Sequence, residues 1–352
     1  MTHRELFHAF VSFERVPRIP RRASFTADLA QRLERELGQV PHAFFAMDNG
    51  RGAGLTPPPG YTAPDFSGYF PDYLGKPGFT IDGNGCGHLN HGYFHFTEYI
   101  SPLRNAVSLR ELEVYPIPDN SGWSDAALAQ AARDAHAAGV QAELFVGHMY
   151  ESAWQIRGYE PFLMDLLTQR EWAELLLDRI SANNRRVAVS AARAGYDCIM
   201  TGDDVANQNA MMFQPDLWRE VMKSRWASVI AAAKAVKPDI HVWYHSDGNI
   251  WDILDDLVEI GIDILNPVQP ECMDPLAIRK RFGKRLAFDG CVGTQSTLPF
   301  GTPDDVRARV RELVRDLDGF HGGLMLSPTH VLEPEVPIAN IRAFFDACDR
   351  PV

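Results

Sequence analysis

The sequence has no long apolar run, no paired cysteine motif and no basic-then-apolar leader. A membrane-spanning helix needs about 18 consecutive apolar residues, and no such stretch occurs. The start, Met1 to Glu5, does not have the build of a signal peptide. The five cysteines are scattered and form no CxxC pair, which argues against a disulfide framework and indicates reduced thiols. We therefore expect a cytoplasmic protein with no membrane partner.

Basic residues are also scarce. The chain has 34 Lys and Arg against 46 Asp and Glu, a formal net charge of −12. A net negative protein repels phosphate backbones, so we expect no nucleic-acid partner. With 352 residues, 45% of them hydrophobic, the chain can bury a large core. No charged or Pro/Gly-rich linker divides it, which predicts one domain over residues 1–352.

Short apolar strands alternate with helical stretches from about residue 110 onward. This alternation predicts parallel βα units. The predicted strands cover residues 41–48, 112–115, 142–148, 198–204, 241–245, 262–267, 285–290 and 323–330. Eight such strands predict an α/β fold, a (β/α)8 TIM barrel. Residues 1–110 contain helices followed by Gly-, Pro- and aromatic-rich loops, which we interpret as an irregular N-terminal elaboration that caps the barrel.

One loop of this elaboration concentrates possible metal ligands. Cys86, His88, His91 and His95 lie within ten residues of one another. Their spacing does not match a structural zinc site. The alternation of His with aromatic residues favours a hairpin with one polar face, although a metal site and a substrate-contacting lid both stay open.

Polar side chains follow the apolar runs of the predicted barrel strands. His245 and Asp247 stand two apart in extended chain, so their side chains leave the backbone on the same side. The carboxyl ends of the strands share one face of a barrel, where active sites lie. This face is predicted to collect His148, Glu151, Asp203, Asp204, His245, Asp247, Gln269, Asp289, Cys291, Gln295 and His330.

Some of these residues also have plain structural interpretations. Asp204 and Asp289 are typical of helix caps, and Gln295 could brace a loop. Arg157, early in a helix behind His148, could clamp a substrate carboxylate bidentately. It could equally be the partner in a buried ion pair, and the pattern slightly favours that interpretation.

Several segments together resemble the uroporphyrinogen decarboxylase superfamily. They are Gly202-Asp203-Asp204, Pro215-Asp216-Leu217-Trp218, His245-Ser246-Asp247-Gly248, residues 263–270, residues 290–301 and residues 337–341. The resemblance implies a (β/α)8 barrel. The superfamily includes cofactor-free decarboxylases and zinc-dependent methyltransferases that move methyl groups between corrinoid proteins and thiols. The N-terminal Arg-Gln-Ala-Gly-Arg motif of the true decarboxylases is absent, so the chain looks closer to the methyltransferase branch.

The resemblance also implies a metal site. His245 matches the first zinc ligand of the methyltransferases, and Asp247 stands where their first ligand cysteine would be. His330 stands at the second cysteine position, ten residues before Asn340. Cys291 could be an extra ligand or simply pack in the core. A set of two imidazoles and one carboxylate is harder than a thiolate set and suits Zn²⁺ as a Lewis acid, or Fe²⁺ or Mn²⁺.

We therefore expect a metal-dependent methyltransferase or demethylase that acts on a small aromatic or carboxylated substrate. Its methyl acceptor or donor would be a corrinoid carried by another protein, and a homodimer is compatible with the resemblance. The residues expected to handle a proton are Asp204, Glu151 and Asp203. The residues expected to bind substrate are His148, Arg157, Gln269, Asp289, Gln295 and Tyr244. Two alternatives stay open: a decarboxylase of another acid, and a non-catalytic barrel that binds a corrinoid or tetrapyrrole.

Overall fold

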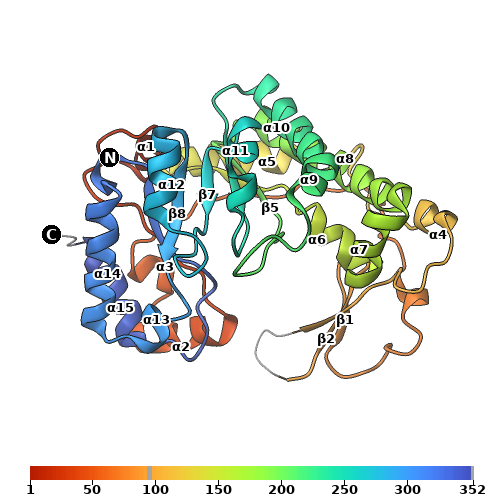
Figure 1. Ribbon diagram of the computed structural model, residues 1–352, viewed down its shortest axis with the longest axis horizontal. Helices are drawn as coiled ribbons and strands as arrows, with labels where there is room; N and C mark the ends of the chain where they lie inside the picture. Colours follow the sequence, from red (N-terminus) through yellow and green to blue (C-terminus); the bar gives the residue numbers. More distant parts are fainter. Residues whose placement is uncertain (93–96, 350–352) are drawn as a thin grey trace.

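Six parallel strands form the centre of the molecule. The computed structural model describes residues 1–92 and 97–349 of the 352-residue chain. The strands pair in the order in which they occur in the sequence, as expected of successive βα units (Figure 1). They are β4 (Glu143–Phe145), β5 (Cys198–Gly202), β6 (His241–His245), β7 (Ile264–Asn266), β8 (Ala287–Val292) and β9 (Leu324–Pro328). All six were predicted from the sequence.

Two irregular segments close this sheet into a barrel. Arg21 forms a parallel bridge with Leu326 of β9, and Arg51 forms one with Ala142, just before β4. The backbone N–H of Asp48 donates to the carbonyl of Arg21, which joins the two segments. The (β/α)8 barrel is therefore confirmed, but parts of its wall come from the region that the sequence assigned to a cap.

The predictions of strands at residues 41–48 and 112–115 were wrong. Residues 41–48 begin with a helix, α3 (Pro41–Phe44), because Pro41 occupies the first helical position, where its missing N–H costs nothing. Residues 112–115 lie at the end of α4 (Leu109–Val114), which a capping box between Ser108 and Glu111 initiates. Local capping signals thus outweighed the short apolar runs.

Helices surround the strands and bury their apolar faces against them. Pro303 and the capping box of Thr302 with Asp305 start α14, whose buried face includes Val306, Val310 and Leu313. Residues 150–168 form two helices that are divided at Gly158, whose φ of 104° favours glycine. The helices of the barrel are α5 (Ala126–Ala137), α6 (Tyr150–Arg157), α7 (Tyr159–Thr168), α8 (Arg170–Ala194), α9 (Pro215–Trp218), α10 (Ser224–Val236), α11 (Leu254–Glu259), α12 (Pro275–Phe282), α13 (Thr297–Phe300), α14 (Pro303–Asp316) and α15 (Ile338–Asp349).

The N-terminal part adds two more helices and a small antiparallel sheet. These elements are α1 (His3–Val11), α2 (Ala27–Leu37), β1 (Phe79–Ile81), β2 (Gly87–Asn90) and β3 (Thr97–Ile100). The sheet lies beside α6 and α7, on the side of the molecule away from α14 and α15 (Figure 1). β2 and β3 form the predicted hairpin.

The hairpin does not gather its predicted metal ligands. Cys86 is buried, the Nε2 atom of His88 pairs with Asp82, and that of His91 pairs with Glu98. His95 lies outside the described residues. Within the described ranges, no group of three close metal-ligating side chains forms here.

The amino-terminal end of the barrel is closed by α1. Phe7, Phe10 and Val11 pack against the starts of the strands, including Ile264 and Met325. The opposite end of the barrel, where the strands finish, stays open.

Over the described part of the chain, no helix combines the length and apolar character needed to cross a membrane.

Candidate metal centre at the barrel mouth

A cavity of about 490 Å³ lies at the carboxyl ends of the strands. Its walls come from both irregular segments and from the ends of β4, β5, β6, β7 and β9. A cavity of this volume suits a small-molecule ligand. Its position is the one where α/β barrels carry their active sites.

His245 projects into this cavity from the end of β6. Its Nδ1 atom lies 2.6 Å from Oδ1 of Asn266, whose own Nδ2 donates to the Asp289 carbonyl at 2.7 Å. The second bond fixes the orientation of the amide, so Nδ1 of His245 must be the donor in the first. Nε2 is therefore the atom left for a ligand, and it lies 3.5 Å from Oδ1 of Asp204. A hydrogen-bonded second nitrogen of this kind is typical of metal-ligating histidines.

Asp204 and Asp247 complete a group with His245. One ligand atom from each of the three lies within 4.8 Å of the others. Gly202 permits this approach, because a Cβ atom there would lie 2.3 Å from the carbonyl oxygen of His245. The backbone N–H of Asp247 donates to Oδ1 of Asp204 at 2.7 Å. Oδ1 of Asp247, in contrast, is buried without a hydrogen-bond partner among the described residues.

The charges within this group are mutually dependent. Burial raises the pKa of Asp247 and the neighbouring Asp204 raises it further, against the effect of His245. Burial alone would lower the pKa of His245, but the carboxylates of Asp204 and Asp247 outweigh it and the pKa is raised. Two carboxylates and one imidazole around an unsatisfied buried oxygen are consistent with a divalent cation site. A divalent metal therefore fits these residues.

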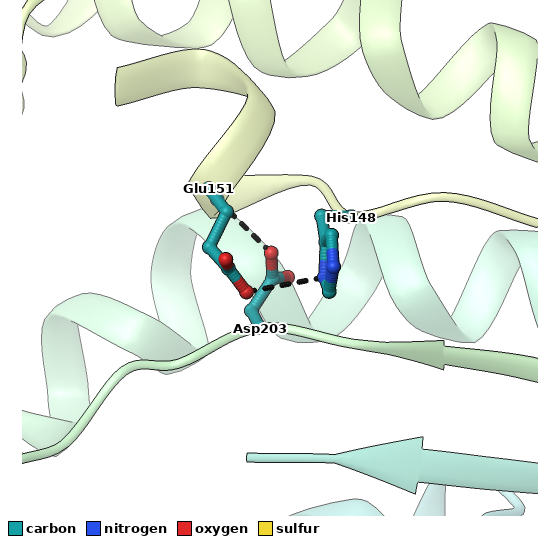
Figure 2. Close-up of side chains that lie close together, drawn as sticks. All are labelled: His148, Glu151 and Asp203. Atoms are coloured by element: carbon teal, nitrogen blue, oxygen red, sulfur yellow. Dashed lines mark hydrogen bonds and ion pairs between the residues drawn. The ribbon is translucent and has the colours of Figure 1, made fainter. Parts of the chain in front are cut away.

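A second group lies beside the first, and both oxygens of its aspartate, Asp203, already have hydrogen-bond partners. His148, Glu151 and Asp203 are also close enough to share an ion (Figure 2). Oδ1 of Asp203 accepts the backbone N–H groups of Met149 and Glu151, and Oδ2 accepts the indole N–H of Trp226. Burial and Glu151 raise the pKa of Asp203 well above its ordinary value. These contacts make Asp203 the anchor of the first turn of α6.

Glu151 connects the two groups. Its Oε1 atom accepts the backbone N–H of Asp204 at 3.0 Å. The same atom lies 3.1 Å from Nδ1 of His148 (Figure 2). That Nδ1 also donates to the carbonyl of Gly202 at 2.6 Å, which leaves Nε2 of His148 available at the cavity wall. Burial raises the pKa of Glu151, and Asp204 adds to the rise while His148 opposes it.

The opposite wall of the cavity carries Arg22, which the sequence did not single out. Its guanidinium bonds Glu143 at 3.2 Å, bonds Asp289, and lies 5.6 Å from the ring centroid of Trp243. Burial alone would lower the pKa of Arg22, but the two carboxylates outweigh it, so the group stays charged. The sequence around it, Ile19-Pro20-Arg21-Arg22, has no periodic pattern that would signal this position.

Residues 137–351 match the family model described as uroporphyrinogen decarboxylase (URO-D). The chain belongs to the uroporphyrinogen decarboxylase family.

Individual relatives are distant. Two uroporphyrinogen decarboxylases of Legionella pneumophila, from strains Lens and Philadelphia 1, are each 24% identical over 192 residues. The match covers 54% of this chain and 51% of each relative, so the chain spans about half the length of these curated relatives. A methyltransferase from Methanosarcina mazei has a TM-score of 0.69 at 19% identity, with 99% of both chains covered. That likeness confirms the fold.

In this member of the family, several residues expected to bind substrate contact neighbouring helices and loops of the protein. The guanidinium of Arg157 is buried in an ion pair with Asp165 at 2.7 Å, which is the arrangement that the alternative interpretation expected. Tyr244 is buried on the helix-facing side of β6, with its ring edge-on to Trp226. Oε1 of Gln269 accepts the backbone N–H of Gly248 and thereby holds the turn after β6.

Asp289 and Gln295 also form hydrogen bonds with other side chains of the protein. Asp289 is buried beneath the cavity, where it accepts from Arg22, from the indole of Trp243 at 2.8 Å and from the hydroxyl of Ser327 at 2.9 Å. Gln295 accepts from Gln208 at 3.0 Å on the surface, as expected for a loop brace. Neither side chain lines the cavity.

The predicted metal ligands divide into two sets. His245 and Asp247 lie together, with Asp204 as a third member that had been expected to handle a proton. His330 lines the same cavity but stays outside this group, with Nδ1 bonded to the Val331 carbonyl at 3.1 Å. Cys291 is fully buried away from the cavity, and burial raises the pKa of its thiol to about 12, which disfavours the thiolate that a metal requires.

Proposed function

We propose that this chain is a metal-dependent methyltransferase or demethylase of the uroporphyrinogen decarboxylase family that acts on a small substrate. The observation that carries the proposal is the buried, unpartnered Oδ1 of Asp247 beside His245 and Asp204. An isolated buried carboxylate oxygen is costly unless a cation meets it. A metal site best explains why this group of residues lies at the carboxyl ends of the strands, where barrels of this family carry their active sites.

Asp204, His245 and Asp247 would hold the ion, and Asn266 would orient His245. A divalent ion there would act as a Lewis acid toward an oxygen atom of the substrate or would lower the pKa of bound water. Zn²⁺, Fe²⁺ and Mn²⁺ all suit a set of oxygen and imidazole ligands. In this set of ligands, Asp204 takes the position that the sequence resemblance had given to His330.

Proton handling falls to Glu151 and His148. The raised pKa of Glu151 lets its carboxyl group retain a proton at a higher pH than usual. Its contact with His148, which lines the cavity, gives the proton a route to a substrate. Asp203 positions Glu151 through the backbone of α6 and makes no contact with the cavity itself.

The remaining walls suit a flat substrate with one polar group. Phe145, Met200 and Trp243 present apolar surface to the cavity, and the charged Arg22 stands next to the indole. An aromatic methyl ether with a carboxylate or hydroxyl group would place its ring on the apolar wall and its polar group near Arg22. A corrinoid on a separate protein would be the partner in methyl transfer.

Incubation of the metal-loaded protein with methoxylated aromatic acids, with and without a methyl-accepting corrinoid protein, tests the proposal. We expect formation of the demethylated product, dependent on metal and abolished in His245→Ala. Failure to move a methyl group from any substrate of this class, with metal bound, would contradict it.

Decarboxylation is the second candidate, and Arg22 is the observation that favours it. A guanidinium on the cavity wall could hold the carboxylate that leaves, next to the metal-binding group. Release of carbon dioxide from a small aromatic acid, without release of methanol or a methyl group, would select this reaction over methyl transfer.

A further inference from the structure

Arg21, a buried arginine of the barrel wall, lacks the buried carboxylate partners that Arg22 and Arg157 have. Arg22 meets two carboxylates whose side chains are 9% and 1% exposed, and Arg157 meets Asp165 at 2% exposed. Arg21 is 5% exposed at its side chain, yet its carboxylate partner, Asp349, is 55% exposed. Nε and Nη1 of Arg21 are both buried without any hydrogen-bond partner among the described residues.

Arg21 lines a separate cavity on the outside of the barrel wall. Neighbouring residues of an extended segment face opposite sides, so Arg21 points outward while Arg22 points into the candidate metal centre. The outer cavity has a volume of about 220 Å³ and lies between α3 and α15. Phe45 and Phe345, stacked 4.1 Å apart, form part of its apolar lining.

A second arginine stands in the same cavity. Arg342 of α15 is 41% exposed and lies 5.4 Å from the ring centroid of Phe44. Its acidic contact, Glu36, is 3.8 Å away and half exposed, so that ion pair is weak. Arg342 can therefore turn toward a ligand at little cost.

Two aspartates share the cavity wall, and one of them, Asp349, bonds Nη2 of Arg21 at 2.6 Å. Asp346 and Asp349 are 68% and 55% exposed, in contact with solvent, whereas the Arg21 guanidinium is enclosed. Charges in water interact weakly, and buried charges interact strongly. The formal charges of the cavity walls cancel, so the group that an anion would meet is the enclosed edge of the Arg21 guanidinium, Nε and Nη1, which Asp349 does not contact.

We propose that this outer cavity is a binding site for a small oxyanion, held by Arg21 from within and by Arg342 at the entrance. A phosphate or carboxylate group matches arginine donors in charge and geometry. Its oxygens would meet the two unpartnered nitrogens of Arg21, which the protein itself leaves unsatisfied. The site lies outside the candidate metal centre and does not depend on the proposed reaction.

Thermal unfolding of the full-length protein in inorganic phosphate or sodium acetate, against chloride at equal ionic strength, tests the proposal. A ligand of the folded state raises Tm with a saturable dependence on concentration. We expect a saturable rise of a few degrees for at least one of the two anions, and the comparison of phosphate with acetate identifies the preferred group.

Three variants make the test specific. Arg342→Gln should weaken the response about tenfold in concentration. Asp349→Asn should lower Tm in chloride, because Arg21 loses its carboxylate, and the anion should restore more stability than it gives the native protein. Arg315→Gln, at an exposed arginine on α14, should respond as the native protein does.

Arg21→Gln, which removes the inner guanidinium, should lose the anion response. The three variants above keep the test informative if that protein does not fold. An identical anion response in the native protein, Arg342→Gln and Asp349→Asn would mean a general salt effect and would overturn the proposal. The absence of any saturable response to either anion would overturn it as well.

Discussion

Two carboxylates at opposite ends of the barrel, the buried Asp197 and the half-buried Asp247, differ in how completely they are satisfied. Asp197, at the amino-terminal end, accepts from Arg4, His8, His136 and the backbone N–H of Ala142. Asp247, at the carboxyl-terminal mouth, keeps one oxygen buried and unpartnered. Both belong to the same strand framework, since Asp197 directly precedes β5 and Asp247 follows β6.

The pKa values of the two carboxyl groups express the same difference. Burial alone would raise the pKa of Asp197, but donors from His8, Arg4 and Ala142 hold it well below its usual range. Burial raises the pKa of Asp247, and no donor compensates fully. A carboxylate with all its donors stabilises the fold, whereas one that lacks them is prepared for a ligand. This agrees with the general division of barrels into a stabilising end and a reacting end.

The largest effect on stability is expected from Asp197→Asn. Asparagine offers one acceptor oxygen and an N–H₂ group where Asp197 offers two charged acceptors to Arg4, His8 and His136, so the buried position loses charge-assisted hydrogen bonds that are together worth about 3 kcal/mol. Chemical denaturation should show this as a lower midpoint with an unchanged slope. Asp239→Asn, at an exposed aspartate paired with Lys237, serves as the control and should change stability by less than about 0.5 kcal/mol. A stable Asp197→Asn protein would remove the contrast between the two ends.

The next effect concerns the orientation of His245. Asn266→Leu removes the acceptor of its Nδ1–H, and loss of such an outer contact typically weakens metal affinity about 10- to 100-fold. Titration with Zn²⁺ against a competing chelator measures this directly. Asn249→Ala, which changes another asparagine of the same loops whose amide bonds the carbonyl of Asn209, should leave the affinity unchanged. Equal affinities in the native protein and Asn266→Leu would contradict the assigned geometry.

A smaller effect is expected in how the free energy of unfolding depends on pH under acidic conditions. Because the pKa of Asp197 is depressed in the folded protein, its contribution is present above the unfolded-state value near pH 4. That contribution is lost as the pH falls further, through the folded-state pKa. The free energy of unfolding of the native protein should therefore fall below about pH 4 more steeply than that of Asp197→Asn. Parallel pH profiles for the two proteins would show that Asp197 is not the group responsible.

The smallest effect is expected from His330→Ala. In the structure, His330 is exposed and bonds the Val331 carbonyl, outside the group formed by Asp204, His245 and Asp247. Metal affinity should change less than about threefold, in contrast to the 10- to 100-fold effect expected for an orienting residue. A loss of tenfold or more would show that His330 turns inward and joins the ligands, as the sequence resemblance implied.

The sequence was sufficient for most of the barrel and for part of the site. Strands β4 to β9 were recognisable because each is a short apolar run between polar turns and a helix. The two closing segments at Arg21 and Arg51 were not, because single bridges leave no periodic pattern. Their absence from the prediction also concealed Arg22, which reaches the cavity from one of them.

Partners in space explain the other differences. His245 and Asp247 were recognised because their spacing alone sets them on one side of a strand. The role of Arg157 depends on Asp165 in the next helix, and that of Asp203 depends on the start of α6. The direction of His330 depends on the turn after Pro328, which has no sequence signature. Such contacts arise only when the helices dock on the barrel.

Metal content of the purified, metal-reconstituted protein, measured by elemental analysis beside Asp247→Asn, tests the central claim most directly. Asp247→Asn keeps the size of the side chain and removes the charge of the unpartnered carboxylate. The proposed centre predicts about one divalent ion per native chain and a large loss of bound metal in Asp247→Asn, with Asp197→Asn retaining its metal where it is folded. No bound metal in the native protein after reconstitution, or equal content in the native protein and Asp247→Asn, would contradict a metal centre at the barrel mouth.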